Sequence, residues 1–259
     1  LWLNESFAEW ASYMATSEAT QYTTAWTEFN ALRKNWAYRQ DQLSTTHPIA
    51  TEMKDLEDVK TNFDGISYAK GASVLQQLVE HVGRENFIKG LRIYFTKHAF
   101  KNTTLNDLMV ELEATSGRDL KPWAATWLQT AGVNTLRPVI EVESGVYKNL
   151  AIKQEAPTMP VDSKELRPHR LRVALFDISG DSLIKRKSVA LDIAGASTDV
   201  TELQGEKEAD LVLINDGDLT YAKLRFDERS IATLKSHIGG LNEPLARALI
   251  WASLWDSVR

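Results

Sequence analysis

Two carboxylates near the start of the chain, Glu5 and Glu9, are the first residues whose type and spacing suit chemistry. At positions i and i+4 of an expected helix they share one face, away from the apolar stripe that begins at Phe7. Taken by themselves, carboxylates so placed are expected to form an ordinary solvated face, which is where Glu residues usually lie. A glycosidase pair is the least favoured interpretation, because side chains one turn apart are too close and too parallel to flank a sugar from opposite sides.

Tyr68 is the second candidate, and it lies in the segment Asp64–Leu75, which reads DGISYAKGASVL. On a helix Tyr68 shares a stripe with Gly71 and apolar residues, so one interpretation is an ordinary core tyrosine whose hydroxyl bonds a neighbour. Gly71 costs a helix about 1 kcal/mol relative to Ala, which predicts that something packs closely against this turn. Lys70 is expected to be solvated, and Asp64 is expected to cap the helix.

The remaining reactive side chains form no recognisable site. The sequence has no Cys, which excludes disulfides and thiol nucleophiles. Its five His are scattered without an H-E-x-x-H motif, so each is predicted to be a surface or capping residue and none is assigned to zinc. They are His47, His81, His98, His169 and His237. The sequence also lacks a Gly-rich phosphate cradle and a Gly-x-Ser-x-Gly motif, which disfavours nucleotide binding and serine hydrolase chemistry.

The composition is that of a globular protein, since 43% of the 259 residues are hydrophobic. With 30 basic and 35 acidic residues the formal charge is -5, and no Lys/Arg-rich block stands out, so nucleic acid is not an expected partner. No stretch approaches the roughly 18 consecutive apolar residues of a membrane-spanning helix. No signal peptide is visible in the sequence given. Together with the lack of Cys, these features predict a cytoplasmic protein.

The period of the hydrophobic residues divides the chain into three parts. Residues 1–136 show helical periodicity, and Thr104 is expected to begin a helix that ends at Ser116 and Gly117. One expected apolar stripe is made of Trp26, Phe29, Leu32 and Trp36.

After Arg137 the period changes to two, so residues 137–226 are predicted to form a small β-sandwich. Turn-forming clusters at 143–145, 179–181 and 215–218 separate its strands. From Asp227 the chain is expected to be helical again up to residue 259. The last helix carries Trp251 and Trp255, and a surface of this kind normally marks a missing partner.

The first ten residues, LWLNESFAEW, resemble the part of the aminopeptidase N family that carries the third zinc ligand in a Leu-Asn-Glu-x-Phe-Ala context. The segment around Tyr68 resembles the Tyr-x-Lys-Gly-Ala segment of the same family. Three further segments resemble the family in the same order along the chain, and the run from Trp127 is most similar to bacterial members. These segments are Ser44–Ile49, Trp127–Gly132 and Leu211–Asp216.

The resemblance implies a zinc-dependent peptidase that hydrolyses the first peptide bond of peptides, a reaction of peptide catabolism. Glu5 would be the third zinc ligand, and Tyr68 would stabilise the oxyanion of the tetrahedral intermediate. The two His ligands and the general base would come from an upstream H-E-x-x-H motif. We therefore expect an internal fragment that begins just after this motif, whose partners are peptide substrates and the missing N-terminal and C-terminal parts of the same chain.

For the fold, the resemblance implies an α + β multidomain arrangement. Residues 1–136 would be the C-terminal helical part of a thermolysin-like catalytic domain, 137–226 the β-sandwich, and 227–259 the first helices of a C-terminal α-helical domain. The fragment alone is expected neither to bind zinc tightly nor to hydrolyse peptides, because one carboxylate cannot make a three-ligand site. The alternative is a non-catalytic module that is related to these peptidases and binds a protein partner.

Overall fold

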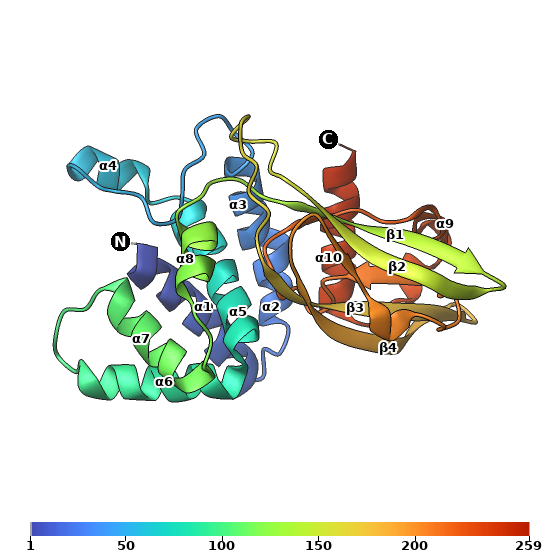
Figure 1. Ribbon diagram of the computed structural model, residues 1–259, viewed down its shortest axis with the longest axis horizontal. Helices are drawn as coiled ribbons and strands as arrows, with labels where there is room; N and C mark the ends of the chain where they lie inside the picture. The colour runs from blue at the N-terminus through green and yellow to red at the C-terminus, as the bar shows by residue number, and fades with distance from the viewer. Residues whose placement is uncertain (1, 259) are drawn as a thin grey trace.

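The computed structural model describes residues 2–258 (Figure 1). Helices of the first half lie on one side of the molecule, and the strands lie on the other side with α9 and α10 beside them (Figure 1). The helices of the first half are α1 (Trp2–Ala19), α2 (Ala25–Glu28), η1 (Phe29–Lys34), α3 (Asn35–Gln40), α4 (Leu56–Thr61), η2 (Ile66–Lys70), α5 (Gly71–Val82), α6 (Arg84–Lys97), α7 (Leu105–Ser116) and α8 (Lys121–Leu128).

Two of these segments, η1 and η2, are π-helices that continue directly into α-helices. The wider turn of η1 corrects one expectation, because Leu32 is 61% exposed and does not face the core with Phe29. Asn30 and Lys34 are buried there instead. A π-helix carries more residues in each turn than an α-helix, so a stripe drawn with a period of 3.6 loses its register within it.

Local capping signals predicted the ends of α7 correctly. The backbone N–H and the hydroxyl of Thr104 both donate to the carboxylate of Asp107, at 2.7 and 2.9 Å. At the other end Gly117 has φ +70°, a left-handed conformation that a glycine adopts without a steric penalty.

The strands form two small sheets. The strands are β1 (Thr135–Glu143), β2 (Val146–Glu155), β3 (His169–Ser179), β4 (Ser182–Ile193), β5 (Ser197–Asp199), β6 (Leu211–Ile214) and β7 (Lys223–Leu224). One sheet has the order β5-β2-β1-β7 and the other β4-β3-β6, and every pair is antiparallel except β1 with β7. The three predicted turns follow β1, β3 and β6, and the first strand begins two residues before the expected change of period.

Two hydrophobic cores follow from this arrangement. One lies among the helices of the first half. The other is shared by both sheets and by α9 (Glu228–His237) and α10 (Pro244–Ser257), which contribute Leu234, Leu249 and Ile250. A 3₁₀ turn, η3 (Thr201–Leu203), follows β5, and another, η4 (Ile238–Gly240), follows α9. The division into three domains remains a prediction.

None of the helices between residues 2 and 258 combines the length and the apolar character that crossing a membrane requires.

His169 corrects the expectation that every His is a surface or capping residue, because its side chain is buried at the start of β3. Its Nε2 lies 3.0 Å from Oε1 of Gln154, which can only accept, so Nε2 carries the proton. Its Nδ1 lies 2.7 Å from the Thr220 hydroxyl, which donates to it. Burial, and then the charge of Arg167, lowers the pKa of His169 to about 3. The ring is therefore neutral and fully hydrogen-bonded.

Replacing His169 should make the free energy of unfolding depend less on pH below pH 7. Between pH 6.5 and about 3 the unfolded chain takes up a proton on this ring and the folded chain does not. The free energy of unfolding therefore decreases as the pH is lowered through this window. By pH 5 this one group has lowered it by about 2 kcal/mol relative to pH 7. We expect urea titrations of His169→Gln to show less loss between pH 7 and pH 5 than those of the unsubstituted chain. The same substitution at half-buried His98 is the control, and parallel profiles for both variants would contradict the assignment.

Candidate functional site

The structure brings the two predicted site residues together, although they lie far apart in the sequence. Glu5 is on α1 and Tyr68 is on η2, and these two helices contact each other. The Glu5 carboxylate lies close enough to Tyr68 to raise the pKa of its hydroxyl. Loss of water contact raises the pKa of Tyr68, and the hydrogen bond and negative charge of Glu5 raise it further. Both side chains are half-buried.

Gly71 allows this close approach. A Cβ atom on Gly71 would lie 2.8 Å from Cβ of Ser6, which is much too close for two carbon atoms. In the space that the glycine leaves, the Ser6 hydroxyl donates to the carbonyl of Ser67 at 2.6 Å. One turn further along α1, the indole N–H of Trp10 donates to Gln76 at 2.9 Å. The prediction that something packs closely against Gly71 is confirmed.

Asp64 begins the π-helix that carries Tyr68, as predicted for a cap. Its Oδ1 accepts from the backbone N–H groups of Ile66 and Ser67, at 2.9 and 3.0 Å. Its Oδ2 lies 2.9 Å from Nε2 of His47. Burial lowers the pKa of His47, but the hydrogen bonds to Asp64 and to the Pro48 carbonyl outweigh burial, so the net shift is upward. His47 thus holds the cap that starts this helix.

Lys70 is fully buried, so the expectation of a solvated lysine is wrong. Its Nζ lies 2.8 Å from Oδ2 of Asp41 and 3.2 Å from the carbonyl oxygen of Gly132. Burial lowers the pKa of Lys70 to about 8, although the charge of Asp41 opposes this shift. The sequence did hold a signal of close packing at this turn, because small residues flank Lys70 on both sides.

Glu9 also departs from the expectation of a solvated face. Its side chain is only 8% exposed and makes a two-pronged ion pair with Arg33, at 2.6 and 2.8 Å. Arg33 lies over the ring of Trp36, 4.7 Å from its centroid. Sequence reasoning missed Arg33, whose partner is 24 residues away. Glu9 is therefore neutralised, whereas Glu5 makes no ion pair with another residue between 2 and 258.

The described residues fit one ligand position of a zinc site and not a complete site. Glu5 offers a carboxylate that forms no ion pair with a cationic side chain of residues 2–258. Over the same residues, no three His, Asp or Glu side chains come together as a metal-binding group. A catalytic zinc takes three protein ligands. This part of the chain can thus contribute one ligand to such a site.

Comparisons with known proteins agree with the geometry. A family model described as "Peptidase family M1 domain" matches residues 1–127. Over its full length the chain is 51% identical to Aminopeptidase N of Streptomyces lividans, of which it covers 31%. The chain belongs to peptidase family M1.

Two further relatives are more distant. Aminopeptidase M1 of Arabidopsis thaliana is 30% identical over 91% of this chain, which covers 26% of that protein. Leucyl aminopeptidase of Saccharolobus solfataricus is 36% identical over 60% of this chain, which covers 19% of that protein. The M1 chain described here thus spans less than a third of the length of each of these relatives.

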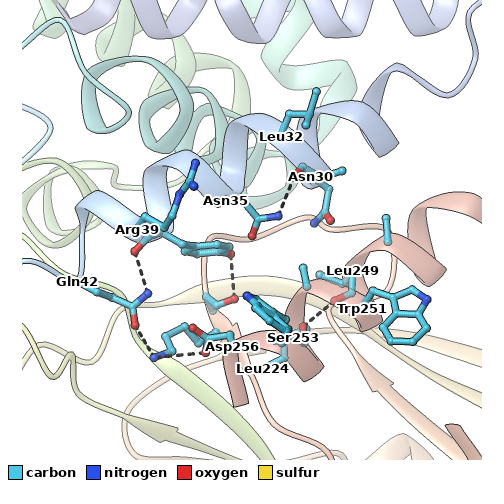
Figure 2. Close-up of a pocket in the computed structure, with 17 residues that line it drawn as sticks. Asn30, Leu32, Asn35, Arg39, Gln42, Leu224, Leu249, Trp251, Ser253 and Asp256 are labelled. Carbon is cyan, nitrogen blue, oxygen red and sulfur yellow. Dashed lines mark hydrogen bonds and ion pairs between the residues drawn. The ribbon is translucent and has the colours of Figure 1, made fainter. Parts of the chain in front are cut away.

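The M1 chain also has a cavity of about 630 Å³ between the η1–α3 segment and α10 (Figure 2). Figure 2 shows Asn35, Arg39 and Gln42 on one wall, opposite Trp251 and other residues of α10. Neither Glu5 nor Tyr68 lines this cavity, so it is separate from the candidate site. Trp251 and Trp255 are 57% and 67% exposed, as expected for the last helix.

Gly71→Ala should destabilise the chain, although Ala favours a helix by about 1 kcal/mol over Gly. The added Cβ must push α1 away from the turn where η2 passes into α5, and overpacking of this kind typically costs about 1 to 3 kcal/mol. Urea unfolding measures the change. Gly239→Ala is the control, because a Cβ there meets no atom within 4 Å. The double variant Ser6→Gly with Gly71→Ala should recover part of the loss, and a Gly71→Ala chain as stable as the unsubstituted one would refute the close contact.

Proposed function

We propose that this chain is part of a zinc-dependent aminopeptidase that removes the N-terminal residue of peptides. The observation that carries the proposal is the packing of α1 against η2, which places Glu5 near Tyr68 in a chain of family M1. The relatives are named as aminopeptidases in a bacterium, a plant and an archaeon, which supports the same reaction.

Glu5 is the proposed third zinc ligand. Its carboxylate is half-buried, it sits next to Tyr68, and it has no competing ion pair within residues 2–258. When bound, zinc supplies Lewis-acid chemistry, which lowers the pKa of water and polarises a carbonyl group. The Arg33 pair makes Glu9 a poor ligand, because a metal ion would have to displace a two-pronged guanidinium. The other ligands and the general base would come from an H-E-x-x-H motif elsewhere in the protein.

Tyr68 is the proposed donor to the oxyanion. Its raised pKa keeps the hydroxyl protonated at neutral pH, so it can donate a hydrogen bond. The rigid attachment of η2 at Ser67 and Asp64 holds the ring in one place before substrate arrives. Donors that are fixed in advance stabilise developing charge without the cost of reorganisation.

We further propose a domain organisation and a cellular location for this chain. Residues 1–136 are the helical part of the catalytic domain, 137–226 a β-sandwich domain, and 227–259 the start of a helical domain. The protein acts in the cytoplasm, in peptide catabolism.

The competing proposal is a non-catalytic interaction module, which the exposed Trp251 and Trp255 favour. The encoding gene separates the two, because only the peptidase needs H-E-x-x-H ahead of Glu5.

The purified chain of residues 1–259 should not hydrolyse an aminoacyl chromogenic substrate, with or without added zinc. One carboxylate cannot hold the ion in a catalytic geometry. Absorbance of the released chromophore measures turnover, and a longer M1 protein that carries H-E-x-x-H serves as the positive control. Turnover by the chain that a chelator abolishes would show that the site has been misplaced.

In the longer protein Tyr68→Phe should lower kcat about 100- to 1000-fold, which corresponds to the loss of one oxyanion donor, about 2.7 to 4 kcal/mol. Its zinc content should stay unchanged, whereas Glu5→Gln should lower both zinc content and kcat. Steady-state kinetics and metal analysis of the same preparations measure these effects. Tyr22→Phe, at an exposed tyrosine, is the control. Turnover of Tyr68→Phe near that of the control would end the oxyanion assignment.

A further inference from the structure

Both π-helices end in a fully buried lysine, and each lysine has one buried aspartate as its partner. Lys34 ends η1, and its Nζ lies 2.5 Å from Oδ1 of Asp218. Lys70 ends η2, and its Nζ lies 2.8 Å from Oδ2 of Asp41. The same arrangement therefore occurs twice in the described structure, once on each π-helix.

Two stacked rings join the lysine pairs. Nζ of Lys34 lies 5.9 Å from the centroid of the Tyr38 ring, and Nζ of Lys70 lies 5.5 Å from that of the Tyr221 ring. The two rings stack with centroids 4.6 Å apart and planes 25° from parallel. The lysines thus belong to one buried assembly, but only Lys70 shares its helix with Tyr68.

We propose that Lys70, through its ion pair with Asp41, is a positioning residue that fixes Tyr68 beside Glu5. Side chains two residues apart on a helix project from nearly opposite sides. Lys70 holds the inner side of η2, and Tyr68 therefore extends from the outer side toward α1. This inference rests on the proposed role of Tyr68 in the reaction.

Asp41 is itself firmly held, so it can act as an anchor. Its Oδ1 accepts from the backbone N–H of Gly132 at 2.9 Å and from the Thr46 hydroxyl at 2.6 Å. Lys70 donates to the carbonyl of the same Gly132. The last turn of η2 is closed by the bond from the N–H of Lys70 to the carbonyl of Gly65, at 2.9 Å. Displacing Lys70 therefore disturbs the turn on which Tyr68 stands.

Stability alone gives no reason for this ion pair. Removing two charges from water is costly, and apolar side chains of similar volume often stabilise a core as well or better. An apolar contact has no preferred direction, whereas the oxygens of Asp41 and Gly132 fix where the Lys70 ammonium group lies. The buried pair is thus suited to setting the rotation of η2 about its axis.

The test uses the purified chain of residues 1–259 labelled with ¹³C-tyrosine. The NMR cross peak of the Tyr68 ring is assigned by its loss in Tyr68→Phe. Lys70→Met should shift this cross peak and abolish its NOE to the ring of Phe63, whose centroid is 6.2 Å away. Lys34→Met is the matched control, because it removes an equally buried, ion-paired lysine from the other π-helix. It should cost similar stability and leave the Tyr68 signals in place.

A folded Lys70→Met chain with unchanged Tyr68 signals would overturn the inference, and so would an equal disturbance by Lys34→Met. If Lys70→Met does not fold, Asp41→Asn decides. This variant keeps the acceptor for Gly132 and turns an amide N–H₂ toward the ammonium group. A shifted Tyr68 signal supports the inference, and an unchanged one refutes it. The readout needs no peptidase activity, so an inactive longer protein would count against the proposed function alone.

Discussion

The contact between Ser6 and Gly71 is the constraint on which the candidate site depends. Glu5 directly precedes Ser6 on α1, and the Ser6 hydroxyl binds the carbonyl next to Tyr68. The turns that pack against each other are therefore the turns that carry the two site residues. A larger side chain at either position would separate the helices and the carboxylate from the phenol together. The packing of these helices and the placement of the two candidate residues therefore rest on the same few atoms.

Local signals in the sequence predicted much of the fold. The cap at Thr104 and the stop at Gly117 depend on residues within one turn of the helix end. The helical region expected from Asp227 also begins there, and the structure shows that Asp227 caps α9. The turns after β1, β3 and β6 also depend on their own residues. The π-helices could not be predicted in this way, because a wheel with a period of 3.6 assigns Leu32 to the core and Lys34 to solvent.

For the site, the sequence predicted the cap at Asp64 and the close packing at Gly71, but it did not predict the buried ion pairs. Glu5 and Tyr68 follow from the resemblance, whereas Lys70 and His169 were expected at the surface. A charged side chain lies in solvent unless a partner offsets the free-energy cost of its burial. Without knowledge of the partner, the sequence therefore predicts that a lysine is exposed. The partners come from distant segments, as Asp218 lies 184 residues from Lys34.

Residues of the strand region also bind the helices that lie beside the candidate site. The family match ends at residue 127, but Lys34 binds Asp218, which follows β6. Gln77 on α5 exchanges hydrogen bonds with the backbone of Arg170 on β3, at 2.8 and 2.5 Å. Residues of the strand region thus supply the partners of the buried Lys34 ammonium group and of the buried Gln77 amide. The helices that carry Glu5 and Tyr68 therefore depend on residues of the strand region for their own rigidity.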